Sequence, residues 1–490
     1  MHKYKDFVII AAGHATQAVI LVLSTRLMTM LLTAQELGRF AIIYAVTALF
    51  VALFISSPGV YAQRRLLEWN RERTVGVLSR RYIYYFLMAA LCISFFLTVF
   101  KQVVGLAVHI SGVWIFGLVF GLLFFTHARS FYANALNIFQ KRLWYILCLN
   151  LTLIFSLLGS LWLVVAFDRV AEFWILGQVL GQAVVFILAG ILFSRVIRRP
   201  AEGKPVAIPS SSGLIRDVVH FAWPLSVASL ILWGHGQAYQ FLTNSLFGLE
   251  VVGFFVVGYN LGTKLMEKVD SLFLSFLDPF FYQEIAHGNR QQRTTAWNRY
   301  ARAFIPAIFL LAAFIGTGRH FLAKLFLAKD FQAISADTML WGTLTALITI
   351  VRAVYTKVGI SELKMTDLLG PYLMGTGVTL TGIVSGAGKA DPYVVIGSSL
   401  LGGAAVMLVY LMIKMHRLLP VSFPVGRLGA AALAIVPMAV FFHLADSWLI
   451  KASLVQAIAV IGLGGIYLLA VEFLFAREWM AVRPSETRTH

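Results

Sequence analysis

The sequence predicts an all-α, polytopic membrane protein with about 14 transmembrane helices, arranged as two pseudo-symmetric six-helix lobes followed by a C-terminal helix pair. Three observations support this prediction. The 490-residue chain is 59% hydrophobic and only 13% charged, which is typical of a membrane protein and not of a soluble one. Apolar windows of about 20 residues recur along the whole chain. Lys and Arg are concentrated in every second connection between these windows, as the positive-inside rule requires.

The apolar windows predict the individual spans. They lie near 7–32, 38–58, 82–100, 113–138, 143–166, 172–194, 218–244, 251–281, 300–318, 335–356, 366–386, 392–413, 428–445 and 452–475. We interpret the first window as a retained helix and not as a signal peptide, because its apolar run is long and no clear small-residue cleavage site follows. The even number of windows and the charge asymmetry predict that both termini are cytoplasmic.

The sequence also predicts an internal duplication. Residues 198–213, RRPAEGKPVAIPSSSG, form the longest Pro-, Ser- and Gly-rich polar stretch and resemble a cytoplasmic linker. On either side, ELGRFAIIY at 36–44 is similar to EVVGFFVVGY at 250–259, and both open the second span of their half. We therefore expect an N-terminal lobe at 1–197, a C-terminal lobe at 214–425 and an additional helix pair with a cytoplasmic tail at 426–490, with a binding cavity between the lobes.

The stretch 260–278, NLGTKLMEKVDSLFLSFLD, has charges where a membrane helix should be apolar. At 100° per residue, one face collects Asn260, Lys264, Glu267, Lys268, Ser271, Ser275 and Asp278. An ionised side chain at the bilayer centre costs about 2.5–3.5 kcal/mol, so this face should meet protein or water and not lipid. We interpret Asn260, Lys264 and Lys268 as substrate-binding residues. Glu267, Asp270 and Asp278 are interpreted as coupling or gating residues. The alternative is a neutralised ion-pair cluster that holds helices together.

Further candidates for substrate binding are three arginines and one polar stretch within the spans. Arg26, Arg129 and Arg352 could line a shared aqueous cavity, although Arg26 could instead extend to the outer headgroups and Arg352 could be a positive-inside residue. His235, Gln237 and Tyr239 fall in the middle of the seventh window, where they could contact sugar or another helix. His235 could also couple transport to protons. We expect Asp278-Pro279 to break the eighth span.

Composition and motifs argue against several other classes of protein. The net charge of +18 comes from cations in short loops and not from a basic domain, so nucleic-acid binding is not expected. The two cysteines, Cys92 and Cys148, fall in apolar windows and support neither a disulfide framework nor a metal cluster. No nucleophile elbow or paired soluble carboxylate is present, so we expect neither an enzyme nor a cofactor.

The sequence resembles the polysaccharide-transporter branch, that of the O-antigen-type flippases, of the multidrug, oligosaccharidyl-lipid and polysaccharide exporter superfamily. The resemblance lies in LLTAQELGRFAIIYAVTALF at 31–50 with Pro58-Gly59, and in HFAWPLSVASLILWGHGQAYQFLTNSLFGLEVVGFFVVGYNLGTKL at 220–265, leading to Asp278-Pro279. It implies a flippase of the bacterial inner membrane that moves an undecaprenyl-pyrophosphate-linked oligosaccharide by alternating access. It also implies membrane lipids, a polysaccharide polymerase and export machinery as partners.

Three alternatives remain open. Lipid II flippases of the same superfamily also use cavity arginines, but the arginine- and aspartate-rich sequence expected after their first helix is missing here. Drug or cation antiporters rely on membrane carboxylates, and the first half has no acid in the middle of a span. A membrane glycosyltransferase or polymerase would need a large extracytoplasmic loop, whereas the outer loops near 101–112 and 319–334 are short.

Overall fold

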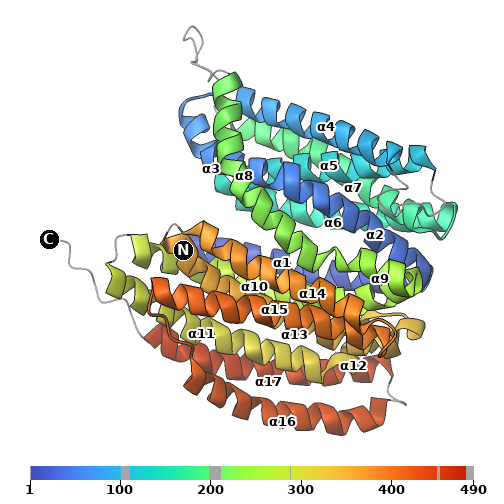
Figure 1. The fold of residues 1–490 in the computed structure, drawn as a ribbon, viewed down its shortest axis with the longest axis vertical. Coiled ribbons are helices and arrows are strands. Elements are labelled where there is room, and N and C mark those ends of the chain that lie inside the picture. Colours follow the sequence, from blue (N-terminus) through green and yellow to red (C-terminus); the bar gives the residue numbers. More distant parts are fainter. Residues whose placement is uncertain are drawn as a thin grey trace. The chain divides into compact units, whose positions relative to one another are not determined.

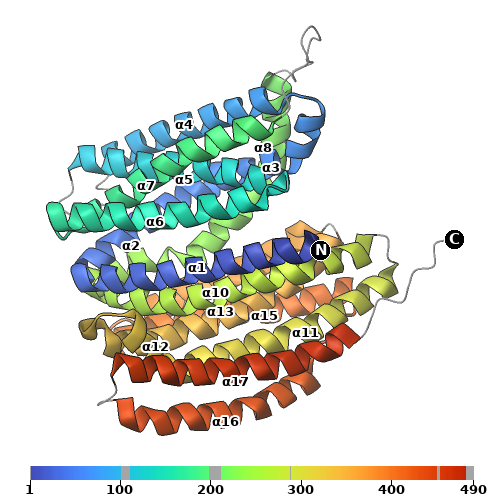
Figure 2. The same cartoon turned by 180° about the vertical axis from the view of Figure 1, so that it is seen from behind.

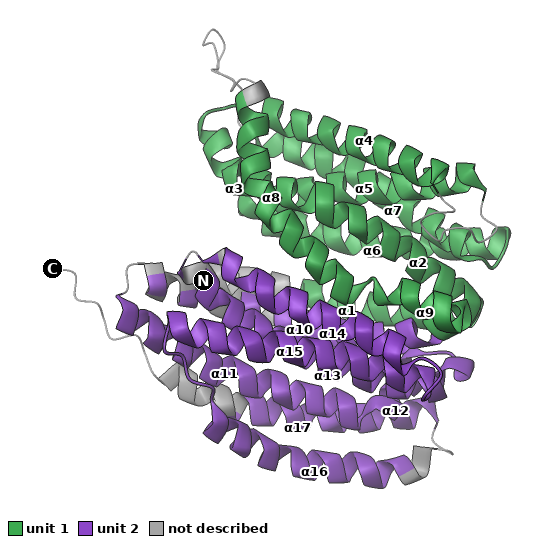
Figure 3. Ribbon diagram, viewed as in Figure 1, with its two compact units in different colours: residues 1–253 green, residues 254–490 purple. Residues whose placement is uncertain are grey.

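The protein is helical throughout the computed structural model, which describes residues 2–100, 111–197, 211–286, 289–362, 364–449 and 453–481 (Figures 1 and 2). These ranges contain helices and turns but no strand. The predicted all-α class is therefore confirmed. The chain divides into two compact units, Met1–Gly253 and Phe254–His490 (Figure 3).

Unit 1 contains the helices of the first half of the sequence and the first span of the second half. In order they are α1 (His2–Leu31), α2 (Ala34–Phe50), the π-helical segment η1 (Val51–Ile55), α3 (Ser56–Arg71), α4 (Val75–Val99), α5 (Gly112–Ile138), α6 (Arg142–Ala166), α7 (Ala171–Val196), α8 (Ser211–Gly236) and α9 (Tyr239–Phe247).

Unit 2 contains the remaining helices, apart from the first turn of α10, which belongs to unit 1. They are α10 (Leu249–Ala286), α11 (Arg290–Thr317), α12 (Arg319–Phe326), η2 (Lys329–Phe331), α13 (Gln332–Ser361), η3 (Met365–Leu368), α14 (Leu369–Gly386), α15 (Pro392–Leu418), α16 (Val425–Leu449) and α17 (Leu454–Ala481).

The predicted spans correspond closely to these helices. Within the described ranges, 13 helical segments are long and apolar enough to cross a membrane, and they match the 13 windows from 38–58 onward. The remaining window, 7–32, falls on α1. The window 38–58 was too short, since the helix runs from Ala34 to Arg71. Its end, α3, is amphipathic and was missed because only one face is apolar, with Leu66 and Trp69 buried.

The same helix packing recurs in the two units, which supports the predicted duplication. In unit 1, α6 packs on α7, α5 packs on α7, and α4 packs on α5. The corresponding spans of unit 2 repeat these three pairs as α14 on α15, α13 on α15 and α11 on α13. The C-terminal pair α16 and α17 lies outside the repeat and packs on α11 and α12, where the Phe442 ring of α16 meets Phe314 edge-on and Phe321 at a tilt.

Small residues bring the paired helices into backbone contact in both halves. A Cβ on Gly177 of α7 would overlap the backbone of α6 at Gly159 and Ser160. The Ser160 hydroxyl donates to the Trp174 carbonyl across this contact at 2.7 Å. Such close packing with small and hydroxylated residues is what membrane helices use in place of a hydrophobic driving force.

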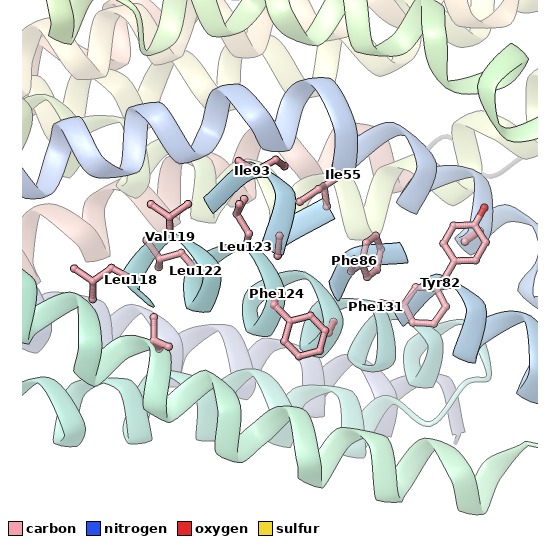
Figure 4. Packing of buried hydrophobic residues seen from close by; sticks show 14 of the residues in the cluster. Ile55, Tyr82, Phe86, Ile93, Leu118, Val119, Leu122, Leu123, Phe124 and Phe131 are labelled. Atoms are coloured by element: carbon pink, nitrogen blue, oxygen red, sulfur yellow. The ribbon is translucent and has the colours of Figure 1, made fainter. Parts of the chain in front are cut away.

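Unit 1 has a continuous apolar core built mainly from α4 and α5. Figure 4 shows part of it, including Ile55 of η1, Tyr82 and Phe86 of α4, and Phe131 of α5. The Tyr82 and Phe131 rings stack nearly parallel with their centroids 6.1 Å apart. This packing holds η1 against the α4–α5 pair.

A buried carboxylate joins α2 to the start of α7. Glu36 is in the first turn of α2, and it accepts a hydrogen bond from the backbone N–H of Ala171 at 2.9 Å. Arg39 pairs with the same carboxylate at 2.8 Å. An anion is favoured at a helix N-terminus because the first backbone N–H groups lack intrahelical partners. Glu250, its counterpart in the sequence repeat, is exposed.

Two expectations about local structure need comment. The predicted break at Asp278-Pro279 was wrong, because α10 runs through both residues to Ala286. Proline is tolerated inside membrane helices where neighbouring groups bond the carbonyl that it leaves without a donor. The connection near 319–334, which we expected to be a short outer loop, contains α12, whose apolar face is buried.

The predicted lobe boundary at 198–213 stays a prediction, because residues 198–210 lie outside the described part of the chain. The described helices divide into compact units at Gly253, since α8 packs on α3 and η1 within unit 1.

The adjacent glycines Gly402 and Gly403 of α15 test the close packing of α14 on α15. A Cβ on Gly403 would overlap the Thr379 hydroxyl and lie 2.6 Å from the Gly375 carbonyl, whereas a Cβ on Gly402 would meet nothing within 4 Å. We expect Gly403→Ala to lower stability by about 1–3 kcal/mol and Gly402→Ala to leave it unchanged or slightly raised. Thermal unfolding in detergent measures both, and equal melting temperatures would contradict this packing.

Candidate functional site

The charged stripe predicted for residues 260–278 lies on the accessible side of α10. Lys264 and Glu267 are exposed, and Asn260, Lys268 and Ser271 are partly exposed. The opposite side of the helix is buried, with Met266 0% exposed. The helical periodicity therefore separates a charged, accessible face from a packed one.

The packed side of α10 is held by glycines. A Cβ on Gly258 or Gly262 would overlap α13, at Ser335 and Thr338 for the first glycine and at Met339 for the second. Gly342 of α13 lies equally close to the backbone of α10 at Tyr259. Three glycines across one contact bring the two backbones together, so α10 cannot rotate its charged face inward without a collision.

The charges of the stripe partly balance one another. Glu267 and Lys268 follow Lys264 by three and four residues, so each is a neighbour of Lys264 one turn along the helix, and the two flank it on either side. Asp270 is half-buried, and the Ser271 hydroxyl donates to the Lys268 carbonyl at 2.9 Å. The side chain of Asp278 lies outside the described residues.

Arg352 of α13 lies over an aromatic ring in unit 2. Its guanidinium carbon is 4.8 Å from the centroid of Tyr372 of α14, a cation–π distance. One terminal nitrogen of Arg352 is buried without a hydrogen-bond partner among the described residues. The Tyr372 hydroxyl lies 3.4 Å from the Thr356 hydroxyl. Arg352 therefore has one donor that the described residues leave unsatisfied.

Arg129 is buried inside unit 1, where it lies 9% exposed. Its Nε has no partner within the part of the chain that the structure describes. The polar residues near it in sequence, His127, Ser130 and Asn134, instead line a cavity of about 160 Å³ beside η1. That volume holds several waters.

Arg26 of α1 is partly exposed near the C-terminal end of its helix.

The polar stretch at 234–240 is not the middle of a continuous helix. α8 ends at Gly236 and α9 begins at Tyr239, so the predicted seventh span is interrupted there. His235 and Tyr239 are buried, and the Gln240 amide donates to the Gln237 side chain at 2.8 Å. In the structure these side chains are packed within unit 1, and a role in binding sugar stays a prediction.

A second distinctive feature is the π-helical segment η1. Pro58 has no backbone N–H, so the Phe54 carbonyl, four residues earlier, lacks its α-helical donor. The Tyr85 hydroxyl of α4 donates to that carbonyl. The Ser226 hydroxyl of α8 donates to the neighbouring Leu53 carbonyl at 2.9 Å. Two helices distant in sequence thus satisfy the carbonyls of the irregular segment.

Sequence reasoning missed Tyr372, Tyr85 and Ser226. A signal existed for the last two, because Pro58 falls at the end of an apolar window and predicts an unsatisfied carbonyl nearby. Nothing local indicates which distant hydroxyls bind this carbonyl.

No group of three metal-ligating side chains was found among the described residues.

The chain matches no protein-family model and no curated protein. Its fold is nevertheless similar to several solved structures. One is an inward-facing multidrug resistance MATE family transporter of the MOP superfamily, with a TM-score of 0.60 and 12% identity over 81% of this chain and 94% of that one. Another is the lipid II flippase MurJ in an inward closed conformation, with a TM-score of 0.60 and 12% identity over 94% of this chain and all of the other.

A third similar structure is a MOP superfamily transporter from Pyrococcus furiosus, described as having a binding pocket of reverse polarity. It has a TM-score of 0.58 and 12% identity over 84% of this chain and 96% of that one. At these identities the similarity establishes the fold. The chain has the fold of MATE and MurJ transporters, which are membrane carriers and not enzymes.

Tyr85→Phe tests whether η1 depends on a hydrogen-bond donor from α4. The change leaves the Phe54 carbonyl without this donor, and we expect the free energy of unfolding to fall by about 1–3 kcal/mol. In a Pro58→Ala background the restored N–H can bond that carbonyl, so the same change should cost much less. Tyr84→Phe, at an exposed neighbouring tyrosine, is the control. Thermal unfolding of Tyr85→Phe, Pro58→Ala, the double variant and Tyr84→Phe measures the coupling between residues 58 and 85. An equal cost of Tyr85→Phe in both backgrounds would contradict this interpretation.

Proposed function

We propose that this protein is a flippase of the bacterial inner membrane that translocates an oligosaccharide linked to a lipid of the undecaprenyl-pyrophosphate type, by alternating access, for polysaccharide export. The observation that supports this most directly is the exposure of Lys264 within a membrane-spanning helix. Because an ammonium group is costly in hydrocarbon, the accessible face of α10 must adjoin water. A wet, cationic face within a membrane protein suits a polar anionic substrate.

Pyrophosphate fits the cationic groups better than a cationic drug would. Lys264 and Lys268 supply point charges, and Arg352 supplies a planar donor set suited to phosphate oxygens. Among its described side chains, the charged stripe of α10 has Lys264 and Lys268 against the single acid Glu267, whereas Asp270 lies off the stripe and is half-buried. We assign Glu267 as the gating residue, because it can pair with the lysines in the empty protein. This pairing breaks when the substrate anion binds the lysines.

The fold supports transport as the general activity. MATE and MurJ structures share it over most of this chain, and the latter is named as a lipid II flippase. Lipid II is a lipid-linked saccharide, so the substrate proposed here is of the same chemical kind. We further propose that both termini are cytoplasmic and that a polymerase and export machinery use the translocated product.

The direct test is translocation by the full-length protein in proteoliposomes, with a fluorescent pyrophosphate-linked oligosaccharide lipid. We expect Lys264→Gln to slow translocation at least tenfold, because a hydrogen bond to a charged group contributes about 1.5–3 kcal/mol. Lys389→Gln, at an exposed lysine between α14 and α15, should have no effect. Both variants should retain the wild-type melting temperature. Unchanged translocation by Lys264→Gln and by Lys268→Gln would contradict the proposal.

Cells that lack the protein separate the competing substrates. We expect an undecaprenyl-linked polysaccharide intermediate to accumulate on the cytoplasmic leaflet. Accumulation of lipid II in its place would assign the protein to cell-wall synthesis. Altered drug sensitivity without any lipid intermediate would assign it to the antiporters.

A further inference from the structure

Unit 1 contains a cavity that the proposed transport mechanism does not use. It has a volume of about 750 Å³, within the range of about 300–1,000 Å³ that is usual for ligand sites. α4, α8 and the η1 region enclose it. The lining residues are mostly aliphatic or aromatic: Leu53, Phe54, Pro58, Arg81, Tyr82, Tyr84, Tyr85, Met88, Leu214, Ile215, Val218, Val219, Ala222, Trp223, Ser226, Val227 and Leu230.

Two polar groups in this wall bond the protein itself, and a third, the Tyr82 hydroxyl, is buried without a partner among the described residues. The hydroxyls of Tyr85 and Ser226 donate to the Phe54 and Leu53 carbonyls of η1. These bonds remove polar atoms from the cavity and leave a surface that favours hydrocarbon. Several lining side chains remain open to a ligand, including Trp223, which is 66% exposed, and Met88, which is 56% exposed.

One end of the cavity is basic. Arg81 is the charged residue in the lining. At the same ends of α4 and α8, Arg80 and Arg216 are exposed, and the Arg64 guanidinium lies 5.2 Å from the Phe221 ring of α8. The exposed Asp217 is the acid beside them. Basic pockets between membrane helices bind anionic lipid headgroups.

The length of the cavity suits a lipid chain. Along α8 it extends from Leu214 to Leu230, which at 1.5 Å per residue is about 24 Å. The hydrocarbon of one leaflet is about 15 Å thick, half of a bilayer core. A chain that starts at the basic end can therefore lie in the cavity for the full depth of its leaflet.

We propose that this cavity is a binding site for an anionic glycerophospholipid of the leaflet at the basic end, which the positive-inside rule places on the cytoplasmic side. One acyl chain lies between α4 and α8, and the headgroup phosphate binds Arg81. The bound lipid fills the space between the two helices and stabilises α8 on η1. This site is independent of the proposed transport substrate, because none of its residues belongs to α10 or α13.

Trp223 provides a reporter for this site. The full-length protein is reconstituted in phosphatidylcholine vesicles that contain a small fraction of lipid with brominated chains, which quench nearby tryptophans. Subtracting the signal of Trp223→Phe isolates this residue from the other tryptophans. We expect brominated phosphatidylglycerol to quench Trp223 at a membrane mole fraction about fivefold lower than brominated phosphatidylcholine does. This preference corresponds to about 1 kcal/mol, the attraction that one basic residue gives an anionic lipid.

Two arginine variants decide the assignment. Arg81→Gln should abolish the preference for phosphatidylglycerol, whereas Arg417→Gln, at an exposed arginine of α15 in unit 2, should keep it. Native mass spectrometry should show phosphatidylglycerol retained by the wild type and lost from Arg81→Gln. Equal quenching by the two brominated lipids would overturn the proposal. Displacement of brominated phosphatidylglycerol by a polyprenyl phosphate, but not by unlabelled phosphatidylglycerol, would overturn it as well.

Discussion

The high cost of an ammonium group in hydrocarbon is the constraint on which the functional interpretation depends. Lys264 is exposed about 15 residues into a helix that crosses the membrane, so its surroundings must contain water or a polar ligand. Soluble proteins expose lysines without consequence, but a membrane protein that does so at this depth has a polar route. The nearby Glu267 and Lys268 extend this polar surface.

Close helix packing makes that surface possible. The glycines Gly258, Gly262 and Gly342 bring α10 and α13 into backbone contact and fix which face of α10 stays accessible. The same use of small residues fixes α6 on α7 and α14 on α15, so both units have rigid pairs of helices. η1 is the contrast, since Pro58 interrupts regular bonding and the segment depends on hydroxyls from α4 and α8. Rigid helix pairs together with the irregular segment η1 thus accompany a polar face in one unit and an apolar cavity in the other.

Much of the fold could be predicted from the sequence because bilayer thickness fixes the length of a span. The 13 matched windows and the charged stripe of α10 both follow from local periodicity. Other features depend on residues distant in sequence and could not be predicted. The Glu36 carboxylate binds the N-terminus of α7, 135 residues away, and Ser226 binds the Leu53 carbonyl, 173 residues away. The continuity of α10 through Pro279 was also not predicted, because the local sequence indicates a break at a proline.

Chemical labelling at residue 264 tests the central claim most directly. In a background with Cys92→Ser and Cys148→Ala, Lys264→Cys is reconstituted in vesicles and treated with a charged, membrane-impermeant thiol reagent, which needs a hydrated thiolate to react. The account predicts rapid modification of Lys264→Cys and none of Met266→Cys, on the buried side of the same helix. Resistance of Lys264→Cys to the charged reagent, together with modification by a membrane-soluble maleimide, would place this face in lipid and contradict the account.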